Sequence, residues 1–169
     1  MKNLKNTFCI VLFSLVTLGT ATAQKKKASP AEMSKGNING ATVAINYSSP
    51  AVNNRVIWGE LVPFGKVWRA GANEATTIET DKELTIEGQK LPAGKYAIFV
   101  IPEKNEVTVL FNKVWKQWGS NSYDAAQDVI KVKVKPVARG EKAERLLYII
   151  GSNEIVLSWD NWNIPIKVK

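Results

Sequence analysis

The stretch Asp128–Val137, DVIKVKVKPV, alternates apolar and charged side chains more cleanly than any other part of the sequence. Successive side chains of a β-strand point to opposite faces of a sheet, so this alternation predicts a strand with one buried and one solvated face. We expect the buried face to carry Ile130, Val132 and Val134. The residues expected to face solvent are Lys131, Lys133 and Lys135.

Other segments between Ala41 and the end of the chain also have the composition of β-strands. In TVAINY (42–47), Val43, Ile45 and Tyr47 alternate with Thr42, Ala44 and Asn46, and KYAIFVIP (95–102) is apolar on both faces, which is typical of a central strand. Closely spaced short strands without intervening helices favour antiparallel pairing over βαβ units. We therefore predict an all-β fold, an antiparallel β-sandwich or partly closed barrel of about nine short strands.

Some segments are expected to interrupt the strands. VIWGELVPFGKVW (56–68) is apolar but contains Gly59, Pro63 and Gly65, which predicts an irregular packed segment. DNWN (160–163) is expected to separate two strands as a turn. We expect one or two single-turn helices, within Asn112–Trp118 and Tyr123–Asp128.

The N-terminus has the order of a signal peptide. Lys2 and Lys5 precede an apolar run, Phe8–Leu18, and the small-x-small sequence Ala21-Thr22-Ala23 follows it. The run is too short for a permanent membrane-spanning helix. We predict cleavage after Ala23, export to the periplasm or beyond, and no transmembrane segment after cleavage, with an uncleaved anchor as the alternative.

Three segments of the chain follow from these patterns. Residues 1–23 are the predicted signal peptide, and residues 24–40 are polar, contain a lysine run and two glycines, and are predicted to be a flexible arm. Residues 41–169 are predicted to form a single β-sandwich domain. The formal net charge of +8 favours anionic envelope polymers or lipid headgroups as partners, or simply a soluble basic surface. The predicted export argues against nucleic acid.

The composition excludes several kinds of catalytic chemistry. The sequence has no His, and its single cysteine, Cys9, lies within the predicted signal peptide. A Ser-His-Asp triad, a Cys nucleophile and a Cys/His zinc site therefore lack their residues in the mature chain. The glycines are too dispersed for a phosphate-binding loop, and Asp124 and Asp128 lack the Asp-x-Asp sequence of a calcium loop. We predict no metal and no cofactor, which leaves carboxylate chemistry, Ser-Lys chemistry or binding alone.

Candidate functional residues gather in VWRAGANEATTIE (67–79). Arg69 offers a planar fork of donors for a carboxylate or phosphate, Asn73 offers an amide, and Glu74 offers an acceptor or a general acid. Trp68 could stack on a sugar ring, and Gly71 allows a close approach of the backbone. A structural interpretation stays open, in which Arg69 pairs with Glu74, Asn73 caps a turn and Trp68 fills the core.

A second cluster of aromatic residues lies in FNKVWKQWGSNSYD (111–124). Trp115 and Trp118 alternate with lysines and Gln117, and Tyr123 follows. Aromatic rings mixed with amides suit a saccharide, whose CH faces stack and whose hydroxyls need hydrogen bonds, although large aromatic residues also pack in β-domains. The predicted ligand-binding residues are Trp68, Arg69, Asn73, Glu74, Trp118 and Tyr123.

Four long, ordered motifs together resemble an exported bacterial family, catalogued as domain of unknown function 2911. They are LVPFGKVWRAGANEATTIE, LPAGKYAIFVIP, VLFNKVWKQWGSNSYD and LSWDNWNIPIKV. The resemblance covers residues 34–168. It implies a compact, β-rich secreted domain without an agreed activity, and it marks the same block from Trp68 to Glu74 and the block Gln117-Trp118-Gly119.

Three functions are consistent with these observations. The leading hypothesis is non-catalytic recognition of an envelope-associated saccharide or peptide. The alternative is a hydrolase with Glu74 as acid or base, for which Glu60 and Asp124 are the only suggested partner carboxylates. A third hypothesis is an envelope scaffold whose lysine face, formed by Lys131, Lys133 and Lys135, contacts a partner in a salt-dependent way.

Overall fold

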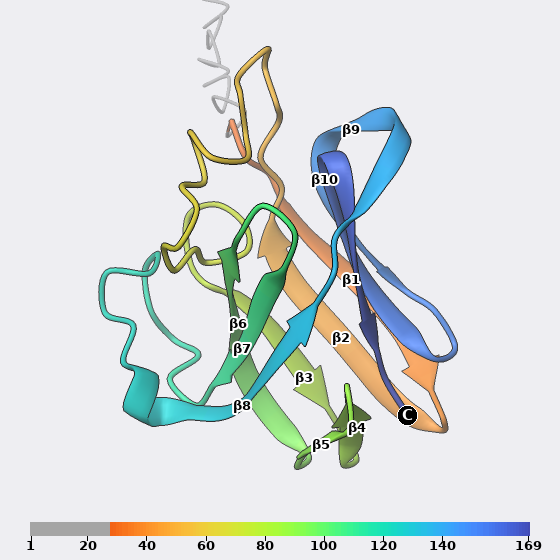
Figure 1. Ribbon diagram of the computed structural model, residues 1–169. Helices are drawn as coiled ribbons and strands as arrows, with labels where there is room; N and C mark the ends of the chain where they lie inside the picture. Colours follow the sequence, from red (N-terminus) through yellow and green to blue (C-terminus); the bar gives the residue numbers. More distant parts are fainter. Residues whose placement is uncertain (1–27) are drawn as a thin grey trace, which may run out of the picture.

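The computed structural model describes residues 28–169 of the 169-residue chain (Figure 1). The predicted signal peptide and residues 24–27 of the predicted arm lie outside the described residues. The described part is all-β, with ten strands and one short 3₁₀-helix. The strands are β1 (Ala31–Ile38), β2 (Ala41–Ser48), β3 (Thr76–Thr80), β4 (Leu84–Ile86), β5 (Gln89–Leu91), β6 (Gly94–Pro102), β7 (Val107–Asn112), β8 (Asp128–Val134), β9 (Val137–Ile150) and β10 (Glu154–Lys167).

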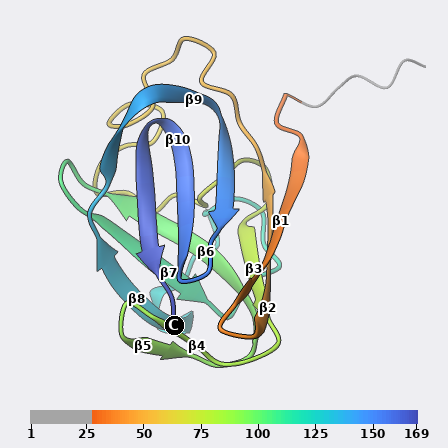
Figure 2. The same ribbon diagram turned by 90° about the vertical axis from the view of Figure 1, so that its right-hand side faces the viewer.

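The strands are arranged as a sandwich that is not closed into a barrel. Six antiparallel strands form one sheet in the order β1-β2-β3-β6-β7-β8, and β9 and β10 form a separate two-stranded ribbon. Figure 2 shows this ribbon in front of β6 and β7. Ile45, Ile78 and Ile98 of the sheet share one apolar cluster with Leu157 and Trp159 of the ribbon. The predicted antiparallel β-sandwich is therefore confirmed.

Strand β8 has the two faces that its alternation predicts. Ile130, Val132 and Val134 are buried, whereas the lysines between them are exposed. One of these lysines, Lys133, forms an ion pair of 2.7 Å with Glu106. The regular alternation survives folding because β8 pairs with β7 on one side only and covers the core with a single face.

The predicted flexible arm is wrong for residues 31–38. These residues form β1, which pairs with β2 from Ala31 opposite Ser48 to Ile38 opposite Ala41. Asn39 and Gly40 connect the strands with φ values of 49° and 79°, as a two-residue hairpin of the type I′ class requires. A polar composition suits β1 because it is an edge strand with one largely solvated face.

Only one of the two expected helical turns forms. Ala125–Gln127 is a 3₁₀-helix capped by Asp124, whose side chain accepts a hydrogen bond from the backbone of Ala126 at 2.9 Å. The expectation of a turn of helix within Asn112–Trp118 is wrong. There the Asn112 side chain accepts a hydrogen bond from the backbone of Val114 at 3.0 Å, so it competes with a helical bonding pattern.

The expected turn at DNWN is also wrong, because β10 continues through it. The pairing of β10 with β9 shifts register between Ser158 and Asp160 and again between Asp160 and Trp162. Asp160 has a φ of 49°, which is consistent with a bulged strand. The polar sequence therefore marks an irregularity within one long strand.

Four of the six tryptophans pack together. The rings of Trp58 and Trp162 stack at a centroid distance of 4.5 Å, and those of Trp68 and Trp159 stack at 5.5 Å. Trp58 and Trp68 come from the irregular segment between β2 and β3, which is therefore packed as predicted. A second apolar cluster, Ala75, Ala97, Phe99 and Leu110, lies apart from the main core.

Candidate functional site

Two sequence motifs that are about 40 residues apart along the chain pair through their backbones at one point. The N–H of Ala75 donates to the carbonyl of Gln117 at 3.0 Å, and the N–H of Gly119 donates to the carbonyl of Asn73 at 3.1 Å. Between these bonds, Glu74 and Trp118 form an antiparallel bridge. The pairing brings Glu74 of the first motif next to Trp118 of the second.

This pairing forms part of a surface groove, here called the outer groove, with a volume of about 480 Å³. Strands β1, β2, β3 and β6 and the segment 115–118 contribute its lining. The lining residues are Ala31, Glu32, Asn46, Tyr47, Ser48, Glu74, Ala75, Thr77, Lys95, Trp115, Lys116, Gln117 and Trp118.

Two indole rings line the outer groove without being buried. Trp118 is 64% exposed and Trp115 is 39% exposed, in contrast to Trp159, which is 1% exposed in the core. The Lys95 ammonium lies 4.6 Å from the centroid of the Trp115 ring and 3.4 Å from the carboxylate of Glu79. This cation–π contact restrains the Trp115 ring in an orientation that the groove can use.

Polar side chains lie between these indoles and the sheet. Asn46 and Thr77 are opposite one another on β2 and β3, and their inward neighbours Ile45 and Ile78 point into the core. Because side chains alternate along a strand, Asn46 and Thr77 belong to the outer face. The Gln117 side chain donates from Nε2 to the carbonyl of Val114, while its buried Oε1 has no donor among residues 28–169.

The segment between Trp68 and Glu74 is held by its own hydrogen bonds. The Trp68 indole N–H donates to the carbonyl of Gly71 at 3.1 Å, and Asn73 donates from Nδ2 to Ser48 Oγ at 3.1 Å. Ala70 and Asn73 both have positive φ, at 54° and 58°. Trp68 is buried in the core, whereas Asn73 ties the segment to Ser48 at the end of β2.

Arg69 does not have the partner that the structural interpretation assigns to it. None of the four ion pairs among residues 28–169 includes Arg69, and its Nε is buried without a hydrogen-bond partner in that range. Loss of hydration on burial lowers the pKa of its guanidinium from the ordinary value. Arg69 lines a pocket different from the outer groove, whereas Glu74 is exposed at the groove.

Tyr123 lies outside both pockets. Its ring packs edge-on against Phe99 at 5.1 Å, beside the second apolar cluster, and its hydroxyl donates to a carboxylate oxygen of Asp128. Burial, followed by the hydrogen bond to Asp128, raises the pKa of the Tyr123 phenol. These contacts anchor the loop that precedes the 3₁₀-helix.

The six predicted site residues therefore divide among three locations. Glu74 and Trp118 line the outer groove, whereas Trp68, Arg69 and Asn73 line the second pocket and Tyr123 lines neither. A hollow of about 320 Å³, lined by Ala28, Ser29, Asn73, Glu74 and Trp118, shares residues with both.

Sequence reasoning missed several groove residues: Glu32, Asn46, Thr77, Lys95 and Lys116. The alternation of TVAINY already places Asn46 on the face opposite Ile45, so a signal for it exists. Glu32 could not be placed without β1. No local pattern indicates which outward residues a distant loop will border.

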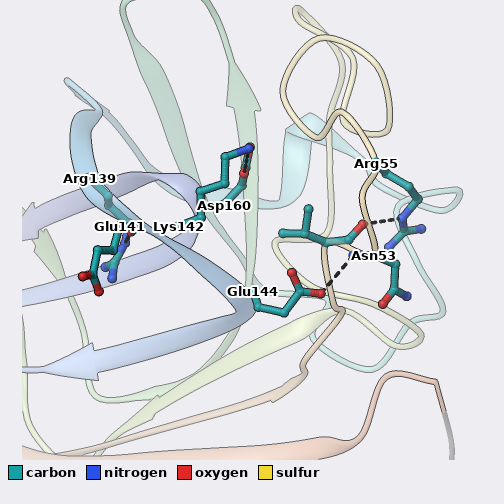
Figure 3. Close-up of polar contacts among 8 residues, drawn as sticks. Asn53, Arg55, Arg139, Glu141, Lys142, Glu144 and Asp160 are labelled. Atoms are coloured by element: carbon teal, nitrogen blue, oxygen red, sulfur yellow. Dashed lines mark hydrogen bonds and ion pairs between the residues drawn. The ribbon is translucent and has the colours of Figure 1, made fainter.

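Figure 3 shows a third region, where polar side chains form an ion pair and hydrogen bonds to the backbone. Lys142 pairs with Asp160 at 3.1 Å, and Glu144 accepts a hydrogen bond from the backbone of Asn53 at 3.0 Å. Arg139 donates to Ser158 Oγ at 2.6 Å. The first and third contacts join β9 to β10, and the second joins β9 to the segment after β2, so we assign these groups a structural role.

Between residues 28 and 169, no group of three or more His, Cys, Asp or Glu side chains is placed to hold a metal ion. In the same range, no helix has the length and apolar character needed to cross a membrane.

The model of one protein family, described as "Protein of unknown function (DUF2911)", matches residues 29–168. The match confirms the resemblance that the four sequence motifs indicate. No curated protein and no solved structure matches the chain.

Proposed function

The chain belongs to the DUF2911 family, and we propose that it recognises a saccharide in the outer groove without catalytic turnover. With the predicted signal peptide, the proposal is for a protein exported to the periplasm or cell exterior that binds a saccharide of the envelope. The single observation that carries it is the pair of accessible indoles, Trp115 and Trp118, beside polar side chains of the sheet.

The chemistry of these groups fits a sugar ring. A pyranose presents an apolar CH face, which an exposed indole covers, and hydroxyls at its edge that both donate and accept hydrogen bonds. Trp118 supplies the accessible ring. Gln117 Oε1 and the carboxylate of Glu74 are acceptors for hydroxyl donors, while the side chains of Asn46 and Thr77 also donate.

A peptide is a weaker fit to this groove. A bound extended peptide usually adds a strand to a sheet edge, where its main chain finds partners. The outer groove lies mainly on side chains of β1, β2, β3 and β6, so most of its floor offers side-chain groups, and β1 alone contributes a strand at the sheet edge.

One observation favours a second candidate, a hydrolase. Glu32 lines the outer groove together with Glu74, so the groove contains two carboxylates. Glycoside hydrolysis commonly uses such a pair. Glu60 and Asp124 do not line the groove. Both Glu32 and Glu74 are exposed, which provides little of the desolvation that prepares a carboxyl group to act as an acid near neutral pH. Binding without turnover is therefore our preferred function.

A thermal-shift screen tests the proposal. The protein is mixed with neutral oligosaccharides, acidic oligosaccharides, peptidoglycan fragments or peptides, and hits are quantified by calorimetry. A ligand at 100 times its dissociation constant stabilises the folded state by about 2.7 kcal/mol. We expect a saccharide to raise the melting temperature and no released product to accumulate.

Two variants connect the binding to the outer groove. Trp118→Ala removes an apolar contact of about 1.5–3 kcal/mol, so we expect at least a tenfold weaker affinity. Glu74→Gln removes a charged hydrogen bond of similar size, about 1.5–3 kcal/mol. Val137→Ala and Glu141→Gln are the matched controls, because both residues are exposed and line none of the pockets described above.

Each competing function has a distinct result. Unchanged saccharide affinity in a folded Trp118→Ala protein would contradict the proposal. Product release that Glu74→Gln abolishes would support the hydrolase, and a response to peptides alone would support peptide recognition. The scaffold hypothesis predicts a partner whose binding weakens with salt and requires Lys131, Lys133 and Lys135, whereas stacking on Trp118 responds little to salt.

A further inference from the structure

The second pocket, here called the Arg69 pocket, has a volume of about 340 Å³. It lies between the irregular segment that follows β2, the turn from Trp68 to Asn73, and Trp159 of β10. Its cationic residues are Arg55 and Arg69, and neither Asp nor Glu contributes to its lining. The pocket therefore carries positive charge without an opposing charge of its own.

Neither arginine is neutralised by a carboxylate elsewhere in the described chain. Arg55 donates from Nε to the carbonyl of Val52 at 3.0 Å, while the neighbouring carboxylate, Glu144, accepts from the backbone of Asn53 (Figure 3). No ion pair among residues 28–169 includes Arg55 or Arg69. Residues 1–27 contain no Asp or Glu, so no side-chain carboxylate from that part of the chain can complete the pocket.

Two buried donors at the pocket also lack acceptors. Arg69 Nε and Trp159 Nε1 have no hydrogen-bond partner among residues 28–169, and Trp159 is 1% exposed. A buried indole N–H normally finds an acceptor, and an unpaired buried donor costs about as much as a lost hydrogen bond. By contrast, the indole N–H of Trp68 is bonded to Gly71. Arg69 and Trp159 therefore lack an acceptor within the described chain, and the charge of Arg69 favours one that is negatively charged.

We propose that the Arg69 pocket binds an oxyanion, a carboxylate or phosphate group of a small ligand. Such a group consists of acceptors only, so it matches the donors of Arg69 and Trp159 that are unpaired in the described chain. The planar guanidinium of Arg69 can hold two oxygens at once, which a point charge cannot. This site is separate from the outer groove and does not depend on the proposed saccharide function.

The burial of Arg69 gives the proposal an energetic basis. A cation that loses part of its hydration without gaining a partner destabilises the folded protein, and a bound anion restores the missing interaction. If the only role of Arg69 were to stabilise the fold, its replacement would lower the melting temperature. Replacing Arg69 by an uncharged residue in anion-poor buffer should therefore leave the melting temperature unchanged or raise it.

Titration of the tryptophan fluorescence tests the proposal, because Trp68 and Trp159 line the pocket. Inorganic phosphate and acetate are added separately, with ionic strength held constant by sodium chloride. We expect a saturable change with at least one of them and a higher melting temperature at saturation. The stronger of the two responses identifies the class of anion.

Three variants locate the response. Arg69→Gln should raise the dissociation constant at least tenfold, and Arg69→Lys, which keeps the charge but loses the fork, should raise it by a smaller factor. Lys104→Gln removes the same charge from an exposed turn outside the pocket and should leave the constant unchanged. Circular dichroism verifies that each variant is folded, and if Arg69→Gln is not, the comparison of Arg69→Lys with Lys104→Gln decides.

Two results would overturn the proposal. One is the absence of a saturable response of the unmodified protein to either anion up to about 10 mM, ten times a millimolar dissociation constant. The other is an equal loss in Lys104→Gln and the Arg69 variants, which would show general charge attraction. A lower melting temperature of Arg69→Gln without any anion response would assign Arg69 a structural role.

Discussion

Gly71 determines how closely the turn after Trp68 approaches the sheet. A Cβ atom at this position would lie 2.7 Å from Thr76 Oγ1 and 3.2 Å from the carbonyl oxygen of Ser48. That carbonyl accepts a hydrogen bond from the backbone of Ala72 at 3.1 Å, and Thr76 Oγ1 donates to the carbonyl of Ala70 at 2.9 Å. The close approach thus serves the contact between two parts of the same chain, and it positions Arg69 and Asn73 beside their pocket.

We predict that Gly71→Ala destabilises the protein by about 1–3 kcal/mol, because the added methyl group overpacks a site closed by the Thr76 side chain and the Ser48 backbone. Urea unfolding measures the change. Gly140→Ala is the control, since no atom lies within 4 Å of a Cβ at Gly140, and we expect it to stay within about 0.5 kcal/mol of the unmodified protein. Equal stability of both variants would contradict this account of the turn.

At the scale of single residues, the sequence predicted candidate residues but not their grouping. Glu74 and Trp118 meet because the backbones of two distant segments pair, and Arg69 is directed elsewhere by a turn with positive φ at Ala70 and Asn73. Alanine rarely adopts a positive φ, so the presence of Ala70 in the sequence does not indicate this turn. The site could be predicted as residue types, whereas its division into two pockets depends on tertiary contacts.

The β1–β2 hairpin is the element on which the outer groove depends most, because Ala31 and Glu32 line the groove from its edge strand. Gly40 in its turn has a φ of 79°, and the nearest atom to a Cβ there is Lys82 Nζ at 3.7 Å. Backbone conformation alone, and not crowding, therefore requires glycine at this position.

We predict that Gly40→Ala destabilises the protein by about 1–2 kcal/mol, the cost of the left-handed conformation for a residue with a Cβ. Amide hydrogen exchange should accelerate first in β1, since it is an edge strand bound to β2 alone within the six-stranded sheet. Asn39→Asp, which also tolerates a positive φ, is the control and should change stability by less than about 0.5 kcal/mol. Uniform exchange across both strands would oppose the prediction.

At the scale of elements, errors arose where local composition and long-range pairing disagree. Residues 31–38 read as polar and flexible, yet the Asn39-Gly40 pair after them is a strong hairpin signal and could have revealed β1. A turn of helix was expected within Asn112–Trp118, but Gln117 and Trp118 pair with the chain near Glu74. Strand β8 was predictable in full because its alternation coincides with its burial.

At the scale of the whole molecule, burial shifts the pKa of one arginine and of two tyrosines in opposite directions. Loss of hydration on burial lowers the pKa of Arg69 from its ordinary value, which lies far above neutrality. For Tyr123 and Tyr148, in contrast, burial raises the pKa of the phenol. Tyr148 is buried between the sheet and the ribbon, its hydroxyl donates to the carbonyl of Ala70 at 2.9 Å, and loss of hydration raises the pKa of its phenol.

The raised pKa makes the folded protein less stable in alkali. Above pH of about 10 the phenol of Tyr148 ionises in the unfolded chain but keeps its proton in the folded one. The unfolded state then binds fewer protons, so the free energy of unfolding decreases as pH rises, whereas below pH of about 10 the contribution of Tyr148 is fully present. Tyr123 acts in the same direction, since burial and its bond to Asp128 also raise its pKa.

We predict that Tyr148→Phe weakens this dependence by at most about 1.4 kcal/mol per pH unit, the limit for one proton. Urea unfolding at about pH 8 and about pH 11 compares the variant with the unmodified protein, so that contributions common to both cancel. The carbonyl of Ala70 keeps its bond from Thr76 in the variant, so the fold should persist at the lower pH. If the free energy of unfolding decreases equally in both proteins, Tyr148 already ionises in the folded state. The prediction would then be wrong, because burial would not keep the Tyr148 phenol away from solvent.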